Sequence, residues 1–324
     1  MVKAIRIHAT GGPEVLRYED VDLPAPGAGE VQLRQHAVGV NFLDIYFRTG
    51  LYSSPSLPFT PGNEGAGEVV AVGPGVEGFA PGDRVAYAGA IGAYAQARNI
   101  SAKFLAHLPA QLSYETGAAM MLKGLTAEYL LFRSYRVQPG DRILVHAAAG
   151  GVGLILCQWA KALGAQVIGT AGSEDKARLA REAGAHETIL YRSEDFVARV
   201  KEITGGKLCA AVYDGVGKTT FPGSLDCLRP FGSFISFGSS SGPVEAFNIG
   251  LLGQKGSLYA QRPTLFSYIG DEARLTEMAG RLTEVVASGK VKIAVNARYK
   301  LQEAAAAHRA LEGRGTTGAA VLLP

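Results

Sequence analysis

Cysteine is scarce in this chain of 324 residues, with three copies at Cys157, Cys209 and Cys227. They form no Cys-x-x-Cys pair and their number is odd, so the sequence argues against a scaffold held together by disulfides. We therefore expect a protein of a reducing compartment, and we predict a cytoplasmic location.

Long runs of like charge and long apolar runs are also missing. The formal net charge is +3 and no block of five like charges occurs. This pattern favours neither a nucleic-acid-binding nor a membrane-binding surface. No apolar stretch is long enough to span a bilayer, and the first twelve residues lack a signal-peptide core. We expect no membrane partner, and the charge disfavours a nucleic-acid partner.

Apolar residues make up 47% of the sequence and charged residues 19%, which allows a sizeable buried core. A chain of 324 residues exceeds one ordinary core, so we expect two domains. Residues 1–123 show short apolar runs broken by Gly and Pro, which favours a β-rich domain. The predicted strands there are Val31–Ala37, Glu68–Val72 and Arg84–Ala88.

Residues 124–264 change to alternating strand and helix patterns. Apolar residues from Val152 to Leu163 follow helical spacing, and Gly164 suits the end of that helix. Alternation of strands with helices predicts a parallel, doubly wound sheet. Other predicted elements are strands at Arg142–His146, Gln166–Thr170, Glu187–Tyr191, Ala210–Asp214, Ser233–Phe237 and Ser257–Gln261, and a helix at Asp175–Ala183.

The tail, residues 265–324, is predicted to pack back on the first domain, so that the second domain is an insertion. Its predicted elements are a helix at Asp271–Ser288, a strand at Ala294–Tyr299, a helix at Leu301–Glu312 and a strand at Ala319–Leu323.

The glycine segment His146–Gly153 lies between a predicted strand and a predicted helix. Glycine allows a tight turn and close approach of a pyrophosphate, and a helix N-terminus offers free N–H groups. Against the Gly-x-Gly-x-x-Gly template, Ala148 replaces the first glycine, whereas Gly150 and Gly153 fit. The surrounding strand–helix pattern makes this a predicted dinucleotide site.

The end of the next strand discriminates between NAD and NADP. A carboxylate there would bind the ribose 2′-hydroxyl and repel a 2′-phosphate, but the position is Ala171. Ser173 can donate a hydrogen bond and Lys176 adds positive charge, while Tyr191 could close the pocket. Glu174 and Asp175 argue mildly the other way, although both suit a helix start. We predict that the cofactor is NADPH.

Three further motifs identify a family. They are Gly39-Val40-Asn41-Phe42-Leu43-Asp44, Pro61-Gly62-Asn63-Glu64-Gly65-Ala66-Gly67 and Lys123-Gly124-Leu125-Thr126-Ala127. In this order they resemble the medium-chain dehydrogenase/reductase superfamily, and specifically its zinc-free, zeta-crystallin-like NADPH:quinone oxidoreductases. The resemblance implies an α/β protein, with a Rossmann NADPH-binding domain over 124–264 and a β-rich GroES-like catalytic domain over 1–123 and 265–324.

Two amides stand where the zinc alcohol dehydrogenases of the superfamily carry metal ligands. Asn41 takes the place of a Cys ligand and Asn63 that of a His ligand. An amide is a poor zinc ligand compared with a thiolate or an imidazole, and Glu64 alone does not make a site. We predict no metal, and this disfavours alcohol oxidation.

Without a Lewis acid the acceptor has to take a hydride readily, as a quinone does because its product is aromatic. The resemblance implies reduction of quinones by NADPH. Two alternatives remain open: reduction of 2-alkenals or enones by NADPH, and a non-catalytic nucleotide- or RNA-binding role like that of some crystallins. The resemblance also implies a homodimer.

Site residues follow partly from these residue arguments and partly from the resemblance. The predicted catalytic residues are Asn41, Asp44, Tyr46 and Tyr52, of which the two tyrosines suit a flat acceptor. The predicted cofactor-binding residues are Asn41, Lys123, Thr126, Gly150, Gly151, Val152, Gly172, Ser173, Lys176, Tyr191, Phe237, Ser239 and Arg314.

Overall fold

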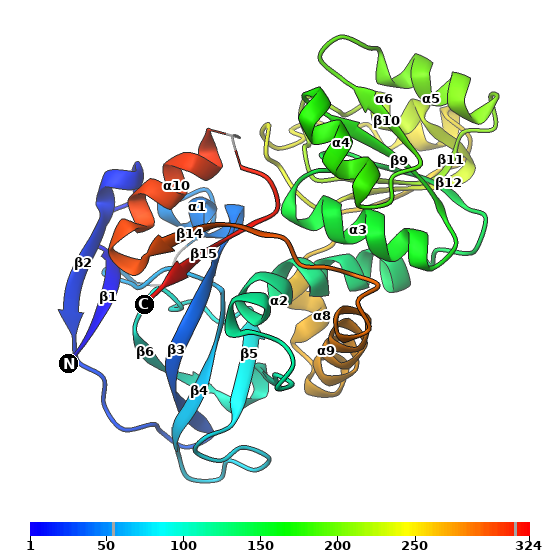
Figure 1. The fold of residues 1–324 in the computed structure, drawn as a ribbon. Coiled ribbons are helices and arrows are strands. Elements are labelled where there is room, and N and C mark those ends of the chain that lie inside the picture. The colour runs from blue at the N-terminus through cyan, green and yellow to red at the C-terminus, as the bar shows by residue number, and fades with distance from the viewer. Residues whose placement is uncertain (54–55, 314–315) are drawn as a thin grey trace. The chain divides into compact units, whose positions relative to one another are not determined.

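The computed structural model describes residues 1–53, 56–313 and 316–324 (Figure 1). These residues divide into two compact units. Unit 1 consists of Met1–Leu125, Tyr268–Ala287 and Ile293–Pro324, and unit 2 of Thr126–Ser267 and Ser288–Lys292. The exact domain boundaries at 123/124 and 264/265 stay predictions.

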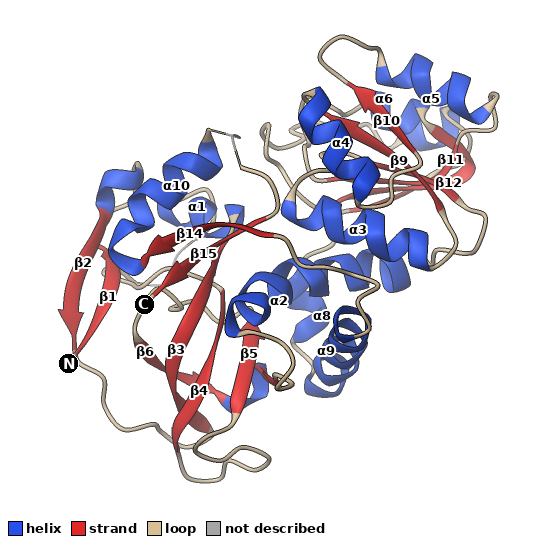
Figure 2. Cartoon of the chain, in the orientation of Figure 1, coloured by secondary structure: helices blue, strands red, loops and turns tan. Residues whose placement is uncertain are grey.

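Unit 2 is built on a parallel sheet covered by helices (Figure 2). The strand order is β10-β9-β8-β11-β12-β13, and every neighbouring pair is parallel. Chain order therefore reverses between β8 and β11, the point at which doubly wound sheets bind ligands beyond the carboxyl ends of their strands. The bounds are β8 Arg142–Val145, β9 Gln166–Ala171, β10 Glu187–Leu190, β11 Cys209–Asp214, β12 Leu228–Ser236 and β13 Tyr259–Gln261.

Helices connect these strands, as parallel neighbours require. The long helices have one apolar face: α3 buries Leu156, Cys157 and Trp159, and α4 buries Ala177 and Ala180. The helices that begin in unit 2 after β8 are α3 Gly151–Ala162, α4 Glu174–Glu182, α5 Phe196–Thr204, α6 Gly223–Asp226, α7 Gly250–Gln254 and α8 Leu265–Ile269.

Unit 1 contains a mainly antiparallel sheet in the order β14-β15-β3-β4-β5-β7, with β6 also paired to β3 and a separate β1–β2 hairpin. The C-terminal strand β15 pairs with β3, so the tail is part of the same sheet as the N-terminal segment. The bounds are β1 Val2–Ile7, β2 Leu16–Val21, β3 Glu30–Val40, α1 Phe42–Thr49, β4 Glu64–Val72, β5 Arg84–Ala88, β6 Ala97–Ser101, β7 Leu105–His107, α2 Tyr114–Tyr129, α9 Glu272–Ala287, β14 Val295–Lys300, α10 Ala304–Glu312 and β15 Ala319–Leu323; short 3-10 turns lie at Pro13–Val15, Ala102–Phe104 and Leu301–Glu303. The last turn of α2 belongs to unit 2 and is followed there by the π-helical turn η3 Leu130–Ser134.

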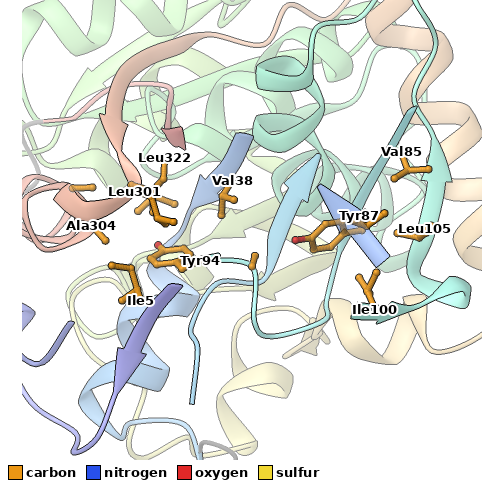
Figure 3. Packing of buried hydrophobic residues seen from close by; sticks show 14 of the residues in the cluster. Ile5, Val38, Val85, Tyr87, Tyr94, Ile100, Leu105, Leu301, Ala304 and Leu322 are labelled. Atoms are coloured by element: carbon orange, nitrogen blue, oxygen red, sulfur yellow. The ribbon is translucent and has the colours of Figure 1, made fainter. Parts of the chain in front are cut away.

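The core of unit 1 joins segments from both ends of the chain. Figure 3 shows Ile5 and Tyr94 beside Leu301 and Ala304, which come from the tail. The core of unit 2 contains Leu144, Ile168 and Val212 from three adjacent strands. Each unit therefore has its own buried core.

Most predicted elements occur close to their expected positions, but several differ in length or were not predicted. β3 continues to Val40 and β12 begins at Leu228, because neighbouring strands extend the pairing beyond the apolar runs. The helices α1 and α2 and the hairpin β1–β2 were not predicted. α2 is buried around most of its circumference, which removes the amphipathic pattern that would reveal it.

Candidate functional site

The predicted dinucleotide turn connects β8 to α3. Gly150 is the N-cap of α3, and Ala147 adopts a φ of 52° in the left-handed region. A Cβ on Gly153 would lie 2.4 Å from the carbonyl oxygen of Ala147. Only glycine fits there, so the first turn of α3 packs directly on the loop. Gly151 and Val152 form the start of α3, where backbone N–H groups have no acceptor within the helix and can stabilise an anion.

A buried polar cluster lies directly beside this turn. His146 bonds through Nδ1 to Thr170 Oγ1 at 3.1 Å and through Nε2 to Ser224 Oγ at 3.0 Å. The Ser224 hydroxyl donates to Asp214 Oδ2 at 3.0 Å. Burial lowers the pKa of His146, although Asp214 opposes this. The cluster links the carboxyl ends of β8, β9 and β11, where the strand order reverses.

The residues predicted to bind the 2′-phosphate lie at and after the end of β9. Ala171 is buried and Gly172 follows it. A Cβ on Gly172 would lie 2.8 Å from the Tyr191 hydroxyl and 3.5 Å from Arg192 Nε. Ser173 caps α4 and its Oγ accepts from the backbone N–H of Lys176 at 3.4 Å.

Glu174 lies next to Ser173, and its negative charge would oppose binding of a phosphate. Its carboxylate pairs with Arg181 on the same helix, which offsets that charge. Arg192 was not predicted as a site residue. Arg192 follows Tyr191 directly in the sequence, so the sequence alone offered it as a further basic residue beside the predicted site.

The loops after β11 and β12 pack against each other. The backbone N–H of Phe237 donates to the carbonyl of Asp214 at 2.8 Å, and that of Ser240 to the carbonyl of Gly215 at 3.2 Å. A Cβ on Gly215 would lie 2.9 Å from the Phe237 ring. Ser239 lies in the same loop, and its carbonyl accepts from Gly242 at 3.0 Å. These contacts place both predicted residues beyond the carboxyl end of β12.

In unit 1 a cluster of amides and carboxylates surrounds the start of α1. Asp44 is fully buried, its Oδ2 accepts from the backbone N–H of Asn41 at 2.9 Å, and its Oδ1 accepts from Asn63 Nδ2 at 3.0 Å. Tyr94 donates its hydroxyl to Asp44 Oδ2 at 3.0 Å. Burial raises the pKa of Asp44 to about 6, although these three donors act to lower it.

Glu64 accepts the other contacts of this cluster. Asn41 Nδ2 donates to Glu64 Oε2 at 2.8 Å, and Lys123 Nζ lies 3.1 Å from the same oxygen. The backbone N–H of Leu122 donates to Glu64 Oε1 at 2.8 Å. The amide nitrogens of Asn41 and Asn63 are therefore both bonded to carboxylates, at the two positions where zinc dehydrogenases have metal ligands.

Tyr46 and Tyr52 belong to a group of aromatic rings beside this cluster. Their ring centroids are 5.2 Å apart, and Phe42 and Phe47 extend the group at 6.4 Å from Tyr46 and 6.0 Å from Tyr52. Both tyrosines are half-buried. Their partial exposure leaves ring surface available to a flat ligand.

The remaining predicted residues are placed as follows. Thr126 is buried on α2, three residues after Lys123. Arg314 lies outside the described residues. Within the described ranges, no group of three or more His, Cys, Asp or Glu side chains could hold a metal ion. The helices of those same ranges include none that is long and apolar enough to cross a membrane.

Comparison with known proteins decides the family. Residues 27–139 match the alcohol dehydrogenase GroES-like domain, and residues 151–282 match the family described as zinc-binding dehydrogenase. A quinone oxidoreductase of Pseudomonas aeruginosa is 53% identical over 325 aligned positions, with 100% of each chain covered. The chain belongs to the quinone oxidoreductase family.

Other members of this quinone oxidoreductase family extend the comparison. The structure of an Escherichia coli quinone oxidoreductase complexed with NADPH gives a TM-score of 0.97 at 50% identity, covering 99% of this chain and 100% of that one. A 2-haloacrylate reductase of a Burkholderia species is 44% identical, covering 100% of this chain and 99% of that one. These matches confirm the predicted family, the fold class and the oxidoreductase class.

Residue patterns did not reveal that Tyr94 bonds to Asp44, or that His308 and Arg48 continue the same series of hydrogen bonds. Tyr94 Oη lies 3.0 Å from His308 Nε2, and Arg48 Nη1 lies 3.2 Å from His308 Nδ1. His308 and Arg48 are separated by 260 positions, so no local signal connects them.

Proposed function

We propose that this quinone oxidoreductase-family chain reduces quinones with NADPH and without a metal ion. The arrangement of Asn41 and Asn63 carries this proposal. Both amide nitrogens donate to carboxylates, Glu64 Oε2 and Asp44 Oδ1, at 2.8 and 3.0 Å. These positions thereby serve a hydrogen-bonded cluster rather than a cation. The naming of relatives as quinone oxidoreductases supports the choice of acceptor.

Residues of unit 2 would hold NADPH. We assign the pyrophosphate to Gly150, Gly151 and Val152, because the first turn of α3 offers N–H groups and no side chain blocks approach at Gly153. The nicotinamide amide is assigned to the backbone at Phe237 and Ser239. Lys123, Thr126 and Arg314 complete the proposed cofactor contacts.

The 2′-phosphate is assigned to the pocket around Gly172. Ser173 and the Tyr191 hydroxyl would donate hydrogen bonds, and Lys176 and Arg192 would supply positive charge. A charge-assisted hydrogen bond is stronger than a neutral one, so these residues favour a phosphorylated ribose over a plain one.

Residues of unit 1 would bind the acceptor. Tyr46 and Tyr52 offer half-buried aromatic faces for a planar quinone. Asn41 would orient the acceptor oxygen or the nicotinamide ribose, and Asp44 would fix Asn41. When bound, NADPH supplies a hydride. The residues here hold the reactants in position, and solvent provides the proton that completes the hydroquinone.

Steady-state kinetics test the proposed reaction. With NADPH, 1,4-benzoquinone and 1,4-naphthoquinone should be reduced with a higher kcat/KM than 2-cyclohexenone or 2-hexenal. NADPH oxidation and hydroquinone formation should proceed in equal amounts. A chain that turned over enones but no quinone would refute the proposed acceptor.

A second function, reduction of activated alkenes, is favoured by the 44% identical 2-haloacrylate reductase. The same hydride donor would serve, because a carbonyl conjugated to the alkene spreads the developing charge onto oxygen. 2-Chloroacrylate in the acceptor panel separates the two functions.

The charge of the 2′-phosphate pocket can be tested by equilibrium binding. Arg192→Ala should raise the Kd for NADPH about tenfold, a loss within the range of one charged hydrogen bond, and should leave the Kd for NADH within twofold. Arg178→Ala, an exposed arginine of α4 paired with Glu182, is the matched control and should change neither constant. Equal losses for NADPH and NADH in Arg192→Ala would contradict this assignment.

The metal-free proposal can be tested by chelation. Turnover should persist after exhaustive dialysis against EDTA and 1,10-phenanthroline, because the amides of Asn41 and Asn63 donate hydrogen bonds where ligands would be needed. Activity that vanished and returned on addition of Zn²⁺ would overturn it.

We also infer a homodimer formed through β13. This strand ends its sheet, and in the described part of the chain it has a strand neighbour on one side, β12. Tyr259 on β13 is 65% exposed and nearby Phe231 is 69% exposed. A second copy could pair its own β13 here and cover both rings, which would remove an open sheet edge.

Light scattering after size-exclusion chromatography tests the dimer. The chain of 34.0 kDa should elute at twice that mass, and Tyr259→Asp should shift it toward the monomer. Tyr18→Asp, at an exposed position on β2, is the control and should not. A monomeric wild-type protein would refute the inference.

A further inference from the structure

A chain of buried hydrogen bonds runs from α10 to the start of α1. Arg48 Nη1 lies 3.2 Å from His308 Nδ1, His308 Nε2 lies 3.0 Å from Tyr94 Oη, and Tyr94 Oη lies 3.0 Å from Asp44 Oδ2. All four side chains are at most 1% exposed. Figure 3 shows the Tyr94 ring beside Ile5, Leu301 and Ala304, so packing fixes its position.

The direction of these hydrogen bonds follows from chemistry. A guanidinium has donors and no acceptor, so Arg48 donates and His308 Nδ1 accepts. The imidazole proton then resides on Nε2, and His308 donates to the Tyr94 oxygen. The Tyr94 hydroxyl is left to donate to Asp44. Every donor therefore points toward the Asp44 carboxylate, and such aligned bonds strengthen one another.

The ionisation states agree with this direction. Burial, with help from Arg48, lowers the pKa of His308 to about 3, so its ring is neutral at neutral pH. Burial raises the pKa of Tyr94 well above its ordinary value, so its hydroxyl keeps the proton. Arg48 is balanced by Glu312 of α10, with Nη2 and Oε1 separated by 2.6 Å. Arg48 also donates through Nε to the Gly11 carbonyl at 3.1 Å.

The far end of this chain is the carboxylate that holds Asn41. Asp44 accepts from the Asn41 backbone and from Asn63 Nδ2, while Lys123 and Glu64 face the same cluster from α2 and β4. If Tyr94 did not hold Oδ2, the carboxylate could rotate and lose the Asn41 bond. The N-cap residue of α1 would then no longer be fixed.

We propose that Arg48, His308 and Tyr94 are positioning residues, whose one-directional hydrogen bonds fix Asp44 and thereby the orientation of Asn41 for the reduction. This inference rests on the proposed function, because it assigns a purpose to Asn41 in that reaction. None of the three residues is placed in contact with a reactant. They act through Asp44, and the tail of the chain supplies one of them.

Two substitutions of His308 test the inference with opposite expectations. The amide of His308→Gln can accept from Arg48 through its oxygen and donate to Tyr94 through its nitrogen, which keeps the direction of the chain. His308→Leu has neither group. Tyr94→Phe removes the last donor, and Tyr87→Phe is the matched control, since Tyr87 is equally buried but bonds to Gln35 instead.

The first readout uses the protein without cofactor. The Asn41 N–H is the donor to Asp44, so its exchange with deuterium reports that bond directly. Mass spectrometry of peptides covering Asn41–Thr49 should show at least tenfold faster exchange at the start of α1 in His308→Leu and Tyr94→Phe. His308→Gln and Tyr87→Phe should stay within threefold of the wild type.

The second readout is the single-turnover rate of NADPH oxidation by 1,4-naphthoquinone, which does not depend on the fraction of active enzyme. His308→Leu and Tyr94→Phe should lower this rate at least tenfold with the Kd for NADPH within threefold, whereas His308→Gln should keep both near wild-type values. If His308→Leu fails to fold, Tyr94→Phe decides.

Two results would overturn the inference: His308→Gln as impaired as His308→Leu, or Tyr94→Phe unchanged in both exchange and rate. Failure of the proposed function is a distinct outcome. In that case the wild-type protein would fail to reduce any quinone with NADPH, whatever the exchange data showed.

Discussion

Because His308 is buried and neutral, we expect acid to lower the free energy of unfolding of the protein. The pKa of His308 is about 3 in the folded chain, against an ordinary value of 6.5. Between these values the unfolded chain binds a proton that the folded chain does not, so stability falls as the pH drops below 6.5 and is unaffected above it. From pH 6.5 to pH 5 this amounts to about 2 kcal/mol, at about 1.4 kcal/mol per pH unit.

Asp44 changes the stability in the opposite direction as the pH falls, because its pKa in the folded chain is raised to about 6. Its folded form binds a proton more tightly, so acidification from pH 6 toward 3.8 adds stability. A comparison of wild type with His308→Gln isolates the histidine, since Asp44 and its donors are present in both proteins. Glutamine does not titrate, so the variant should lose about 2 kcal/mol less than wild type between pH 7 and pH 5.

Urea unfolding at the two pH values measures this difference. Hydrogen exchange of peptides from β3 reports unit 1, whereas the single tryptophan, Trp159, lies in unit 2 and would report the other core. Losses that agreed between wild type and His308→Gln to within about 0.5 kcal/mol would refute the neutral, buried state of His308.

Two further predictions concern unit 2. Gly153→Ala should weaken NADPH binding at least tenfold and destabilise the chain, because the new Cβ would lie 2.4 Å from the Ala147 carbonyl oxygen. Titration calorimetry with NADPH measures the loss. Gly280→Ala is the control, since Gly280 has open space around it. The thiols Cys157 and Cys209, whose pKa burial raises to about 12, should react with a disulfide reagent at pH 8 far more slowly in the native chain than in urea. Rapid labelling of the folded protein would contradict that burial.

The sequence by itself determined the architecture of unit 2. Apolar periodicity predicted the six strands and the helices α3 and α4 there, because each element buries one face and its spacing records that face; the shorter helices α5, α6 and α7 were not predicted. The turn residues Gly150 and Gly153 were identifiable since a close backbone approach permits no side chain. Ala171 was equally informative, because the absence of a carboxylate is visible in the sequence alone.

Unit 1 was less accessible to such reasoning. Its buried helix α2 has no polar face to give a period, and α1 was not predicted although it carries Asp44, Tyr46 and Arg48. Asn41 and Asn63 were recognised as replacing metal ligands, but their hydrogen bonds to Glu64 and Asp44 were not. Those partners depend on how β3, β4 and α1 come together.

Tertiary structure alone decided the polar cluster that ends at Asp44. The tail strand β15 pairs with β3, and this pairing brings α10 with His308 and Glu312 to Arg48 across 260 positions of chain. Local patterns encode which residues are buried in one element, whereas the partner of a buried polar side chain depends on which distant element covers it. The sequence therefore determined where we propose that a dinucleotide binds, and the fold decided what holds Asn41.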